Sequence, residues 1–444
     1  MDSSYSSDQQ SAAKPRVSPD GAPLVNLEGK LFPPVPESVE KTGTSETVLR
    51  DMALKLSSTV PRFTTQWAAE RLHLPLQLTE HLYWSLKQDH LIEVLGQEGP
   101  FSYRYAVTDR GNQAAARSFE ICGYVGPAPV SLKAYTDALH LQHDSRPQLM
   151  LDEVREAISG LVLPEHSVQI AALAALSARS LFLFGPAGNG KTSLGRMLHQ
   201  VFEGDLWIPH CIAIDNSIIR IYDPEVHEAV ETDDSNSGKI DRRWILIKRP
   251  FLVAGGEMTM DELDLAYSQS MRFYESPPHL KANGGTFLID DFGRQRIEPH
   301  ELLNRWIVPL ENQIDHLTLH TGQKIQIPFK LMLIVATNLQ VSDVADPAFL
   351  RRMGYRLFMD KPDAESYAKI FKRYASSAGT EASDERIKTI LERYKRESRE
   401  LRASEPRDLI ERARDICRLH QKPLQLTDDV MDLAWEGYFG NAPT

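Results

Sequence analysis

The sequence of 444 residues is poor in cysteine, with only Cys122, Cys211 and Cys417, which lie far apart. Cysteines without a short repeated spacing exclude a disulfide framework and a zinc-ligand pattern, and they are typical of a reducing compartment. No apolar run approaches the roughly 18 residues of a membrane span, and the start lacks a signal-peptide core. We therefore expect a cytoplasmic protein without membrane insertion.

An excess of positive charge is also missing. Lysine and arginine total 50 against 61 aspartates and glutamates, which gives a formal net charge of −11. This balance gives the chain no global attraction to nucleic acid or to an anionic membrane. A hydrophobic content of 42% is ordinary for a globular protein, and the length suggests two or three domains.

The strongest positive signal is a phosphate-binding motif. The apolar residues 181–184 predict a buried strand, and they run directly into a segment that fits G-x-x-x-x-G-K-[ST]. Glycines let backbone N–H groups point at phosphate oxygens, Lys191 can reach the β- and γ-phosphates, and Thr192 can bind Mg²⁺. The sequence thus predicts a nucleoside triphosphate site formed by Gly185, Pro186, Ala187, Gly188, Asn189, Gly190, Lys191, Thr192 and Ser193.

A second apolar strand, at residues 286–289, ends in two carboxylates. In phosphate-loop enzymes the first carboxylate after such a strand holds Mg²⁺ and the next polarises the attacking water. We assign these roles to Asp290 and Asp291. The letters Asp291-Phe-Gly also occur in protein kinases, but the chain has no H-R-D catalytic loop and its glycine loop is of another class, which excludes a kinase.

Three later segments complete an ordered set of motifs. They are a strand over residues 331–337 followed by Asn338, the run Asp346-Pro-Ala-Phe-Leu-Arg351-Arg352, and Pro406-Arg407. Over about residues 150–440 this set resembles the AAA+ ATPases. The resemblance implies an α/β fold, with a parallel sheet flanked by helices as the P-loop NTPase core and a C-terminal helical lid.

The resemblance also implies roles for the later residues. Asn338 is sensor 1, Arg407 is sensor 2, and either Arg351 or Arg352 is the arginine finger. A finger stabilises charge on the transition-state phosphates and is often supplied by a neighbouring subunit. The resemblance therefore implies a homo-oligomeric ring, a hexamer, that binds ATP and Mg²⁺.

One subgroup, the MoxR-like proteins, is similar in a further way. Alternating apolar residues around a turn at 321–324 predict a β-hairpin within residues 317–329, and a long excursion spans about 222–265. These resemble the pre-sensor hairpin and helix-2 insert of that subgroup. The subgroup usually carries Asp-Glu where this chain has Asp290-Asp291, so a hydrolysis-impaired ATP-dependent scaffold is an alternative interpretation.

The region before the ATPase motifs has its own pattern. Three helices, two strands around a Gly-rich turn and a final helix, within residues 45–118, resemble a winged-helix domain. This segment holds eight Lys/Arg and eight Asp/Glu, which favours a protein contact over DNA because phosphate binding needs clustered positive charge. Residues 242–249, which begin with Arg242-Arg243, are expected to form an exposed strand with basic ends, and they are the one concentrated basic patch.

These patterns predict five regions: a disordered tail (1–44), a winged-helix-like domain (45–118), a connector (119–150), the nucleotide-binding α/β core (151–360) and a helical lid (361–444). The leading interpretation is an ATP-hydrolysing, ring-forming remodelling or assembly chaperone that acts on an unidentified protein client. The alternative is a DNA-binding regulator, switched by ATP, that uses the winged-helix region.

Overall fold

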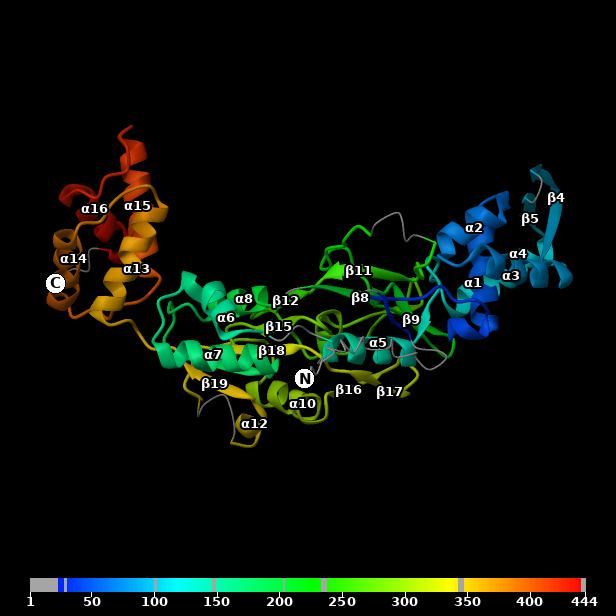
Figure 1. The fold of residues 1–444 in the computed structure, drawn as a ribbon, viewed down its shortest axis with the longest axis horizontal. Coiled ribbons are helices and arrows are strands. Elements are labelled where there is room, and N and C mark those ends of the chain that lie inside the picture. Colours follow the sequence, from blue (N-terminus) through cyan, green and yellow to red (C-terminus); the bar gives the residue numbers. More distant parts are fainter. Residues whose placement is uncertain are drawn as a thin grey trace, which may run out of the picture.

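The computed structural model describes residues 23–27, 30–99, 102–145, 149–202, 204–232, 238–341 and 347–440. The molecule is elongated (Figure 1). A central α/β part carries the C-terminal helices at one end and a group of N-terminal helices at the other.

The central layer is a five-stranded parallel sheet. Its order is β12 (Phe251–Ala254), β15 (Thr286–Ile289), β18 (Met332–Thr337), β7 (Leu181–Phe184) and β19 (Tyr355–Phe358). Leu183 of β7 lies opposite both Ala336 and Leu357, so strands far apart in the sequence are neighbours here. The predicted α/β fold class is confirmed, and β7, β15 and β18 are the strands that the sequence predicts.

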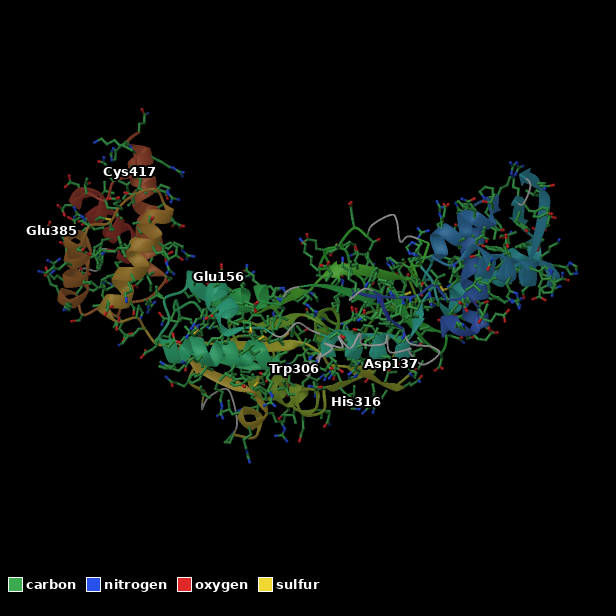
Figure 2. All side chains as sticks on the ribbon, viewed as in Figure 1. Asp137, Glu156, Trp306, His316, Glu385 and Cys417 are labelled. Carbon is green, nitrogen blue, oxygen red and sulfur yellow. The ribbon has the colours of Figure 1, made fainter. Side chains whose placement is uncertain are left out.

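Helices cover both faces of this sheet. Alternate residues of each strand therefore pack into two different hydrophobic cores. Leu181 and Leu183 pack with the helices α6 (Leu151–Ala157), α7 (Glu165–Ser177) and α8 (Lys191–Gln200) and the short η2 (Ile158–Gly160). Phe182 packs with α10 (Pro299–Asn312), α12 (Pro347–Arg352) and η4 (Asp261–Leu263). Figure 2 labels Glu156 of α6 and Trp306 of α10 on opposite sides of the sheet.

A second, mixed sheet extends the core toward the N-terminal helices. Its order is β13 (Ala266–Ser268), β14 (Phe273–Glu275), β10 (Ser217–Arg220), β9 (Cys211–Ile214) and β6 (Val130–Ser131). Beside it lie the pair β8 (Asp205–Pro209) and β11 (Trp244–Lys248), the helix α5 (Leu132–Asp144) and the short α9 (Pro278–Lys281). Most of the excursion predicted at 222–265 thus precedes β12, whereas a helix-2 insert would lie between the second and third core strands.

The predicted hairpin is confirmed as β16 (Ile314–Thr318) paired with β17 (Lys324–Pro328). Leu317 lies opposite Ile325, and both side chains are buried in the core of the second sheet. The hairpin runs from α10 directly into β18, so it joins the end of one core element to the strand that leads to Asn338.

The N-terminal helices occupy the predicted places: α1 (Glu46–Ser58), α2 (Thr65–Leu72), α3 (Leu76–Gln88) and α4 (Asp109–Ile121). A small sheet lies beside them, in the order β3 (Phe63–Thr64), β5 (Ser102–Val107) and β4 (Ile92–Gly99). Their hydrophobic core also includes Cys211, Ile218 and Phe273 from the second sheet. The N-terminal helices and the second sheet therefore share one core.

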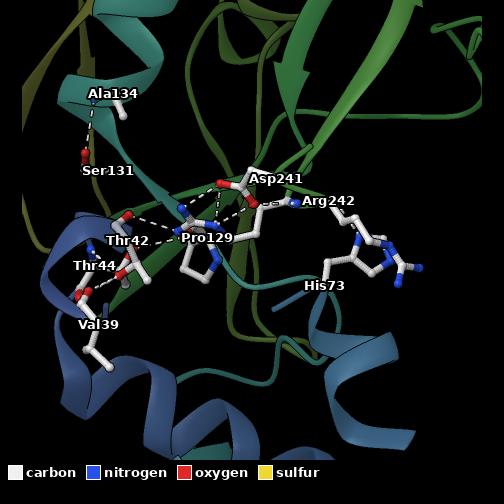
Figure 3. A network of polar contacts seen from close by, with 10 residues as sticks. Val39, Thr42, Thr44, His73, Pro129, Ser131, Ala134, Asp241 and Arg242 are labelled. Carbon is white, nitrogen blue, oxygen red and sulfur yellow. Dashed lines mark hydrogen bonds and ion pairs between the residues drawn. The ribbon is translucent and has the colours of Figure 1, made fainter. Parts of the chain in front are cut away.

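The basic patch expected at Arg242-Arg243 is wrong for Arg243, whose side chain is only about 4% exposed. Its guanidinium pairs with Asp241 at 2.8 Å and donates to the carbonyl oxygens of Thr42 (2.9 Å) and Pro129 (3.0 Å). Figure 3 shows this network, which joins three segments that are distant in sequence. A buried cation persists only when it is paired and hydrogen-bonded, as here.

The tail predicted at 1–44 is wrong for its second half. The strands β1 (Val25–Leu27) and β2 (Lys30–Phe32) and the turn η1 (Glu40–Thr42) are ordered, while residues 1–22 lie outside the described part. Trp207 Nε1 donates to the carbonyl of Leu31 (2.8 Å) and the Asp241 amide donates to Pro33 (2.9 Å). We call residues 30–44 the N-terminal strap, since these contacts, rather than a periodic pattern of its own, fix it.

The connector predicted at 119–150 is likewise more ordered than expected, since it contains β6 and the 13-residue helix α5. Tyr135, Ala138 and Leu139 recur at helical spacing and are fully buried in the core of the second sheet. Their burial explains why this segment is a structural part of the core rather than a link.

The C-terminal region is helical, as predicted, with α13 (Ala364–Ser377), α14 (Asp384–Arg396), α15 (Glu405–Leu419) and α16 (Asp428–Phe439). These helices enclose a core of their own, which includes Tyr367, Tyr394 and Trp435. They form a separate group beyond α6 and α7 (Figure 1).

Two kinds of feature are not found in the described part of the chain. No single helix there is both long and apolar enough to cross a membrane, although the bent pair Leu151–Gly160 and Glu165–Ser177, at 116°, meets the length and composition together. No group of three or more His, Cys, Asp or Glu side chains is placed to hold a metal ion there.

Candidate functional site

The phosphate loop lies between the end of β7 and the start of α8. Gly185, Gly188 and Gly190 have positive φ angles of 133°, 80° and 85°, in the region that favours glycine. At Gly185 a side chain is also excluded by space, because its Cβ would lie 2.3 Å from the carbonyl oxygen of Met359, just after β19. The loop is thus folded against the end of the sheet in a form that only glycine permits at this position.

Lys191 is the first residue of α8, and its side chain folds back over the loop. The ammonium donates to the carbonyl oxygens of Gly185 (2.8 Å) and Pro186 (2.9 Å). Burial lowers the pKa of this ammonium, and the charges of Asp291 and Asp290 oppose the shift. A cation held by neutral carbonyls, with two carboxylates close by, is placed to pair with an anionic ligand.

Asp290 and Thr192 come together from β15 and α8. The Thr192 hydroxyl donates to Oδ2 of Asp290 at 2.8 Å, and the Asp290 amide donates to the carbonyl of Ala254 at the end of β12. The two residues are 98 positions apart in the sequence, and the parallel register of β15 and β18 beside β7 brings them to one edge. Hydroxyl and carboxylate oxygens are the hard ligands that Mg²⁺ prefers, so this pair fits that ion.

Asp291 lies on the exposed side of the same turn. Its φ of 47° is left-handed, and its amide donates to Oδ1 of Asp290 at 3.0 Å. Gln295, which the sequence did not single out, donates through Nε2 to the carbonyl of Asp290 at 2.9 Å and accepts from the amide of Gly293 at 2.8 Å. Gln295 thus fixes the turn that carries both carboxylates.

Asn338 follows β18, the strand beside β15. Its Oδ1 atom is buried and has no hydrogen-bond partner among the described residues. The Thr337 hydroxyl before it donates to the carbonyl of Phe292, and the Phe292 amide donates to Ala336, so the ends of β15 and β18 are tied together. An unpartnered buried acceptor is costly, because its hydrogen bond to water is lost and not replaced.

The two finger candidates lie away from these contacts. Arg351 is exposed on α12 and donates to the carbonyl of Pro347 within its own helix (3.2 Å), whereas Arg352 contacts Glu311 of α10 (3.2 Å). Their motif residue Asp346 lies outside the described residues. Within a single chain, no described contact joins Arg351 to the phosphate loop.

Arg407 lies in the first turn of α15, and its side chain is half exposed. Its guanidinium donates to Oδ1 of Asp408, at 3.1 and 3.2 Å, and this hydrogen bond raises the pKa of Arg407 above its ordinary value. The residues of this region that do contact the loop are Ala403 and Ser404, which precede it. Nothing in the sequence motif could have identified them.

Residues 363–437 match a family described as a domain of unknown function (DUF8689), and none of the curated proteins matches the chain. Among solved structures, a mutant of RuvB from Thermotoga maritima is similar at 14% identity and a TM-score of 0.36, over 66% of this chain and 73% of that one. NtrX from Brucella abortus with ADP is similar at 13% identity and a TM-score of 0.40, over 66% of this chain and 59% of that one. Values this low say nothing about activity.

Proposed function

We propose that this protein is an AAA+ ATPase that binds ATP with Mg²⁺ and hydrolyses it to ADP and phosphate. The observation that carries the proposal is the 2.8 Å contact between Thr192 and Asp290 beside a glycine loop and a buried lysine. Two oxygen ligands, one from the start of α8 and one from the end of β15, meet where a nucleotide-bound Mg²⁺ requires them.

Different residues of the site bind the phosphates, the ion and the attacking water. Backbone N–H groups of the loop and the Lys191 ammonium bind the phosphates, while Thr192 and Asp290 hold the ion. Bound Mg²⁺ supplies positive charge against the phosphate oxygens. Asp291 orients the attacking water, and the unpartnered Oδ1 of Asn338 accepts a hydrogen bond from that water.

We further propose that the protein acts as a hexameric ring on a protein client, in the manner of a remodelling or assembly chaperone. The exposure of Arg351, away from its own loop, supports a role for it or Arg352 as a finger toward a neighbouring subunit. The β16–β17 hairpin before β18 supports the MoxR-like assignment, whereas the position of the excursion before β12 departs from it.

The order of the N-terminal elements supports the winged-helix assignment and a protein-binding role. Along the chain they are α1, β3, α2, α3, β4, β5 and α4. Trp84 on α3 is 59% exposed, and the same helix exposes Glu80. It also exposes Lys87, so its charges balance, and an exposed tryptophan without clustered positive charge suits a protein better than a duplex. Burial of Arg243 removes half of the basic pair that favoured the DNA-binding regulator.

The test is ATP binding and turnover over a range of protein concentrations. Lys191→Ala should weaken ATP binding by about ten- to hundredfold, since it removes a charged hydrogen-bond donor. Arg351→Ala with Arg352→Ala should lower turnover by about a thousandfold and leave binding intact. Arg418→Ala, an exposed arginine on α15, is the matched control. Unchanged turnover in the double variant would contradict the ring.

A further inference from the structure

The turn between α14 and α15, residues 397–404, touches the phosphate loop directly. The Ser404 amide donates to the carbonyl of Gly188 (2.9 Å), and the Ala403 amide donates to Oδ1 of Asn189 (3.2 Å). A Cβ at Gly188 would lie 2.8 Å from the Ser404 hydroxyl, so the Ser404 side chain also packs closely against this glycine. We call residues 397–404 the lid turn.

Asn189 holds both sides of this contact. Its side chain is buried, with 5% of the residue exposed. While Oδ1 accepts from the lid turn, Nδ2 donates to the carbonyl of Pro186 in the phosphate loop (3.4 Å). A single amide therefore links the loop to a segment that lies 214 positions later in the sequence.

The Pro186 carbonyl connects Asn189 to the ligand site. The same oxygen that accepts from Asn189 also accepts from the Lys191 ammonium, at 2.9 Å. When Lys191 transfers its hydrogen bonds to a phosphate, this carbonyl loses its stronger, charged donor. Phosphate binding therefore changes the hydrogen bonding of the amide that holds the lid turn.

The lid turn is in turn fixed to the core of the C-terminal helices. Arg402 donates its amide to the carboxylate of Glu405 (3.0 Å), which is buried at 3% exposure. The same oxygen accepts from the hydroxyl of Tyr394 (2.7 Å), and Tyr394 accepts from Tyr367 (3.1 Å). The turn and helices α13–α15 are thus tied together, and a shift of the turn moves them.

We propose that Asn189 is a positioning residue that fastens the lid turn to the phosphate loop, so that nucleotide binding sets the position of the C-terminal helices. This inference rests on the proposed ATP binding. It assigns to Asn189 a role that the phosphate-loop motif does not require, since the motif accepts any residue at this position.

The experiment compares full-length wild type, Asn189→Ala, Asn189→Asp and the control Ser404→Ala, each with and without a nonhydrolysable ATP analogue. Hydrogen exchange reports the Ala403 amide, and labels on Leu173→Cys and Leu433→Cys report the distance between α7 and α16. Both leucines are about half exposed, and all three native cysteines are buried, so labelling is selective.

With each variant saturated by the analogue, we expect Asn189→Ala to speed exchange of the Ala403 amide by roughly tenfold and to abolish the nucleotide-dependent change in distance. Asn189→Asp keeps the acceptor for Ala403 and should restore the protection of that amide. If the alanine variant fails to fold, the aspartate variant still tests the inference. Ser404→Ala keeps its backbone amide and should behave as wild type.

Wild-type exchange and distance response in both Asn189 variants would overturn the inference while ATP binding stands. If the wild type binds no ATP analogue, the proposed function fails and the coupling fails with it. In that case faster Ala403 exchange in nucleotide-free Asn189→Ala would show fastening without coupling.

Discussion

At the scale of single residues, Asp291 shows how the backbone and the side chain of a site are matched. Its φ of 47° is left-handed, where aspartate and asparagine are found more often than longer side chains. Gln295 holds the neighbouring carbonyl of Asp290, so the turn cannot easily rotate. The carboxylate is exposed and its direction is set by the backbone.

We predict that Asp291→Asn lowers ATP turnover by about a hundredfold or more and leaves ATP affinity within a few-fold, because a general base is lost while the shape is kept. Steady-state turnover and nucleotide titration measure the two quantities. Equal turnover in variant and wild type would contradict the assigned role.

The same position tests the alternative of a hydrolysis-impaired scaffold, on which Asp291→Glu should raise turnover. We expect no gain in turnover, because glutamate adopts the left-handed conformation less readily than aspartate. A clear rise in turnover would favour the scaffold.

The sequence indicates which residues form the site, and that assignment stays a prediction, whereas their contacts could not be predicted. The motif specifies Lys191 and Thr192 because phosphate chemistry requires them. It is silent on Asn189, whose partner Ala403 is 214 positions away and is brought near only by the packing of the C-terminal helices. Gln295 was missed because a glutamine in a turn carries no pattern.

At the scale of elements, a buried ionic cluster joins α9, α10 and the β16–β17 hairpin. Asp315 of β16 is fully buried and accepts hydrogen bonds from His279 (2.8 Å) and Arg305 (2.7 Å). Burial opposes ionisation of Asp315, but these hydrogen bonds and the charges of the same partners outweigh it, so the pKa of Asp315 lies below its ordinary value. The cluster holds the hairpin that leads into β18.

We predict that Asp315→Asn lowers the free energy of unfolding by about 2 to 4 kcal/mol, because the partly buried Arg305 and the buried His279 lose their counter-charge. Chemical denaturation measures the loss. Asp137→Asn, which breaks an exposed pair with Lys133, should change stability by less than about 1 kcal/mol. The contribution of Asp315 is present above its unfolded pKa and is lost as the pH falls through its lower folded value. Equal effects of the two variants would count against the cluster.

Elements differ in how well the sequence predicts them. The strands β7, β15 and β18 were predicted because parallel strands covered on both faces are unbroken apolar runs. The pairing of β8 with β11 was not predicted. The paired residues are 35 or more positions apart, and whether such strands form depends on the side chains that pack against them. The burial of Arg243 could not be predicted for the same reason. An arginine in this sequence indicates a surface charge, and it is buried only because three distant segments pack around it.

At the scale of the whole molecule, the N-terminal helices meet the second sheet through a pair of histidines. The ring of His73, after α2, lies 5.0 Å from the ring of His210, which follows β8. His73 pairs through Nδ1 with the carbonyl of Arg242 (2.7 Å). Burial, and next the charge of His73, lower the pKa of His210 to about 4. His210 is therefore neutral at pH 7, and burial also lowers the pKa of His73.

We predict that the docked arrangement loses stability as the pH falls from about 6.5 to about 4. The unfolded chain binds a proton at His210 in this range and the folded chain does not, so acid favours unfolding. Thermal unfolding of wild type and His210→Gln between pH 7.5 and 4.5 measures the difference, and the variant should show a flatter dependence. His316→Gln, at an exposed position on β16, should keep the wild-type slope. A variant slope equal to that of wild type would contradict the assignment.

The N-terminal strap decides how this protein can be dissected. A fragment cut at residue 45, the boundary that the amino-acid pattern suggests, removes the carbonyls of Leu31 and Thr42 from Trp207 and Arg243. A fragment of residues 45–118 alone exposes the apolar surface that Cys211, Ile218 and Phe273 cover in the whole chain. The N-terminal helices are therefore not an autonomous module. A pull-down or duplex-binding assay on them in isolation would measure non-specific binding to apolar surface that the whole chain buries.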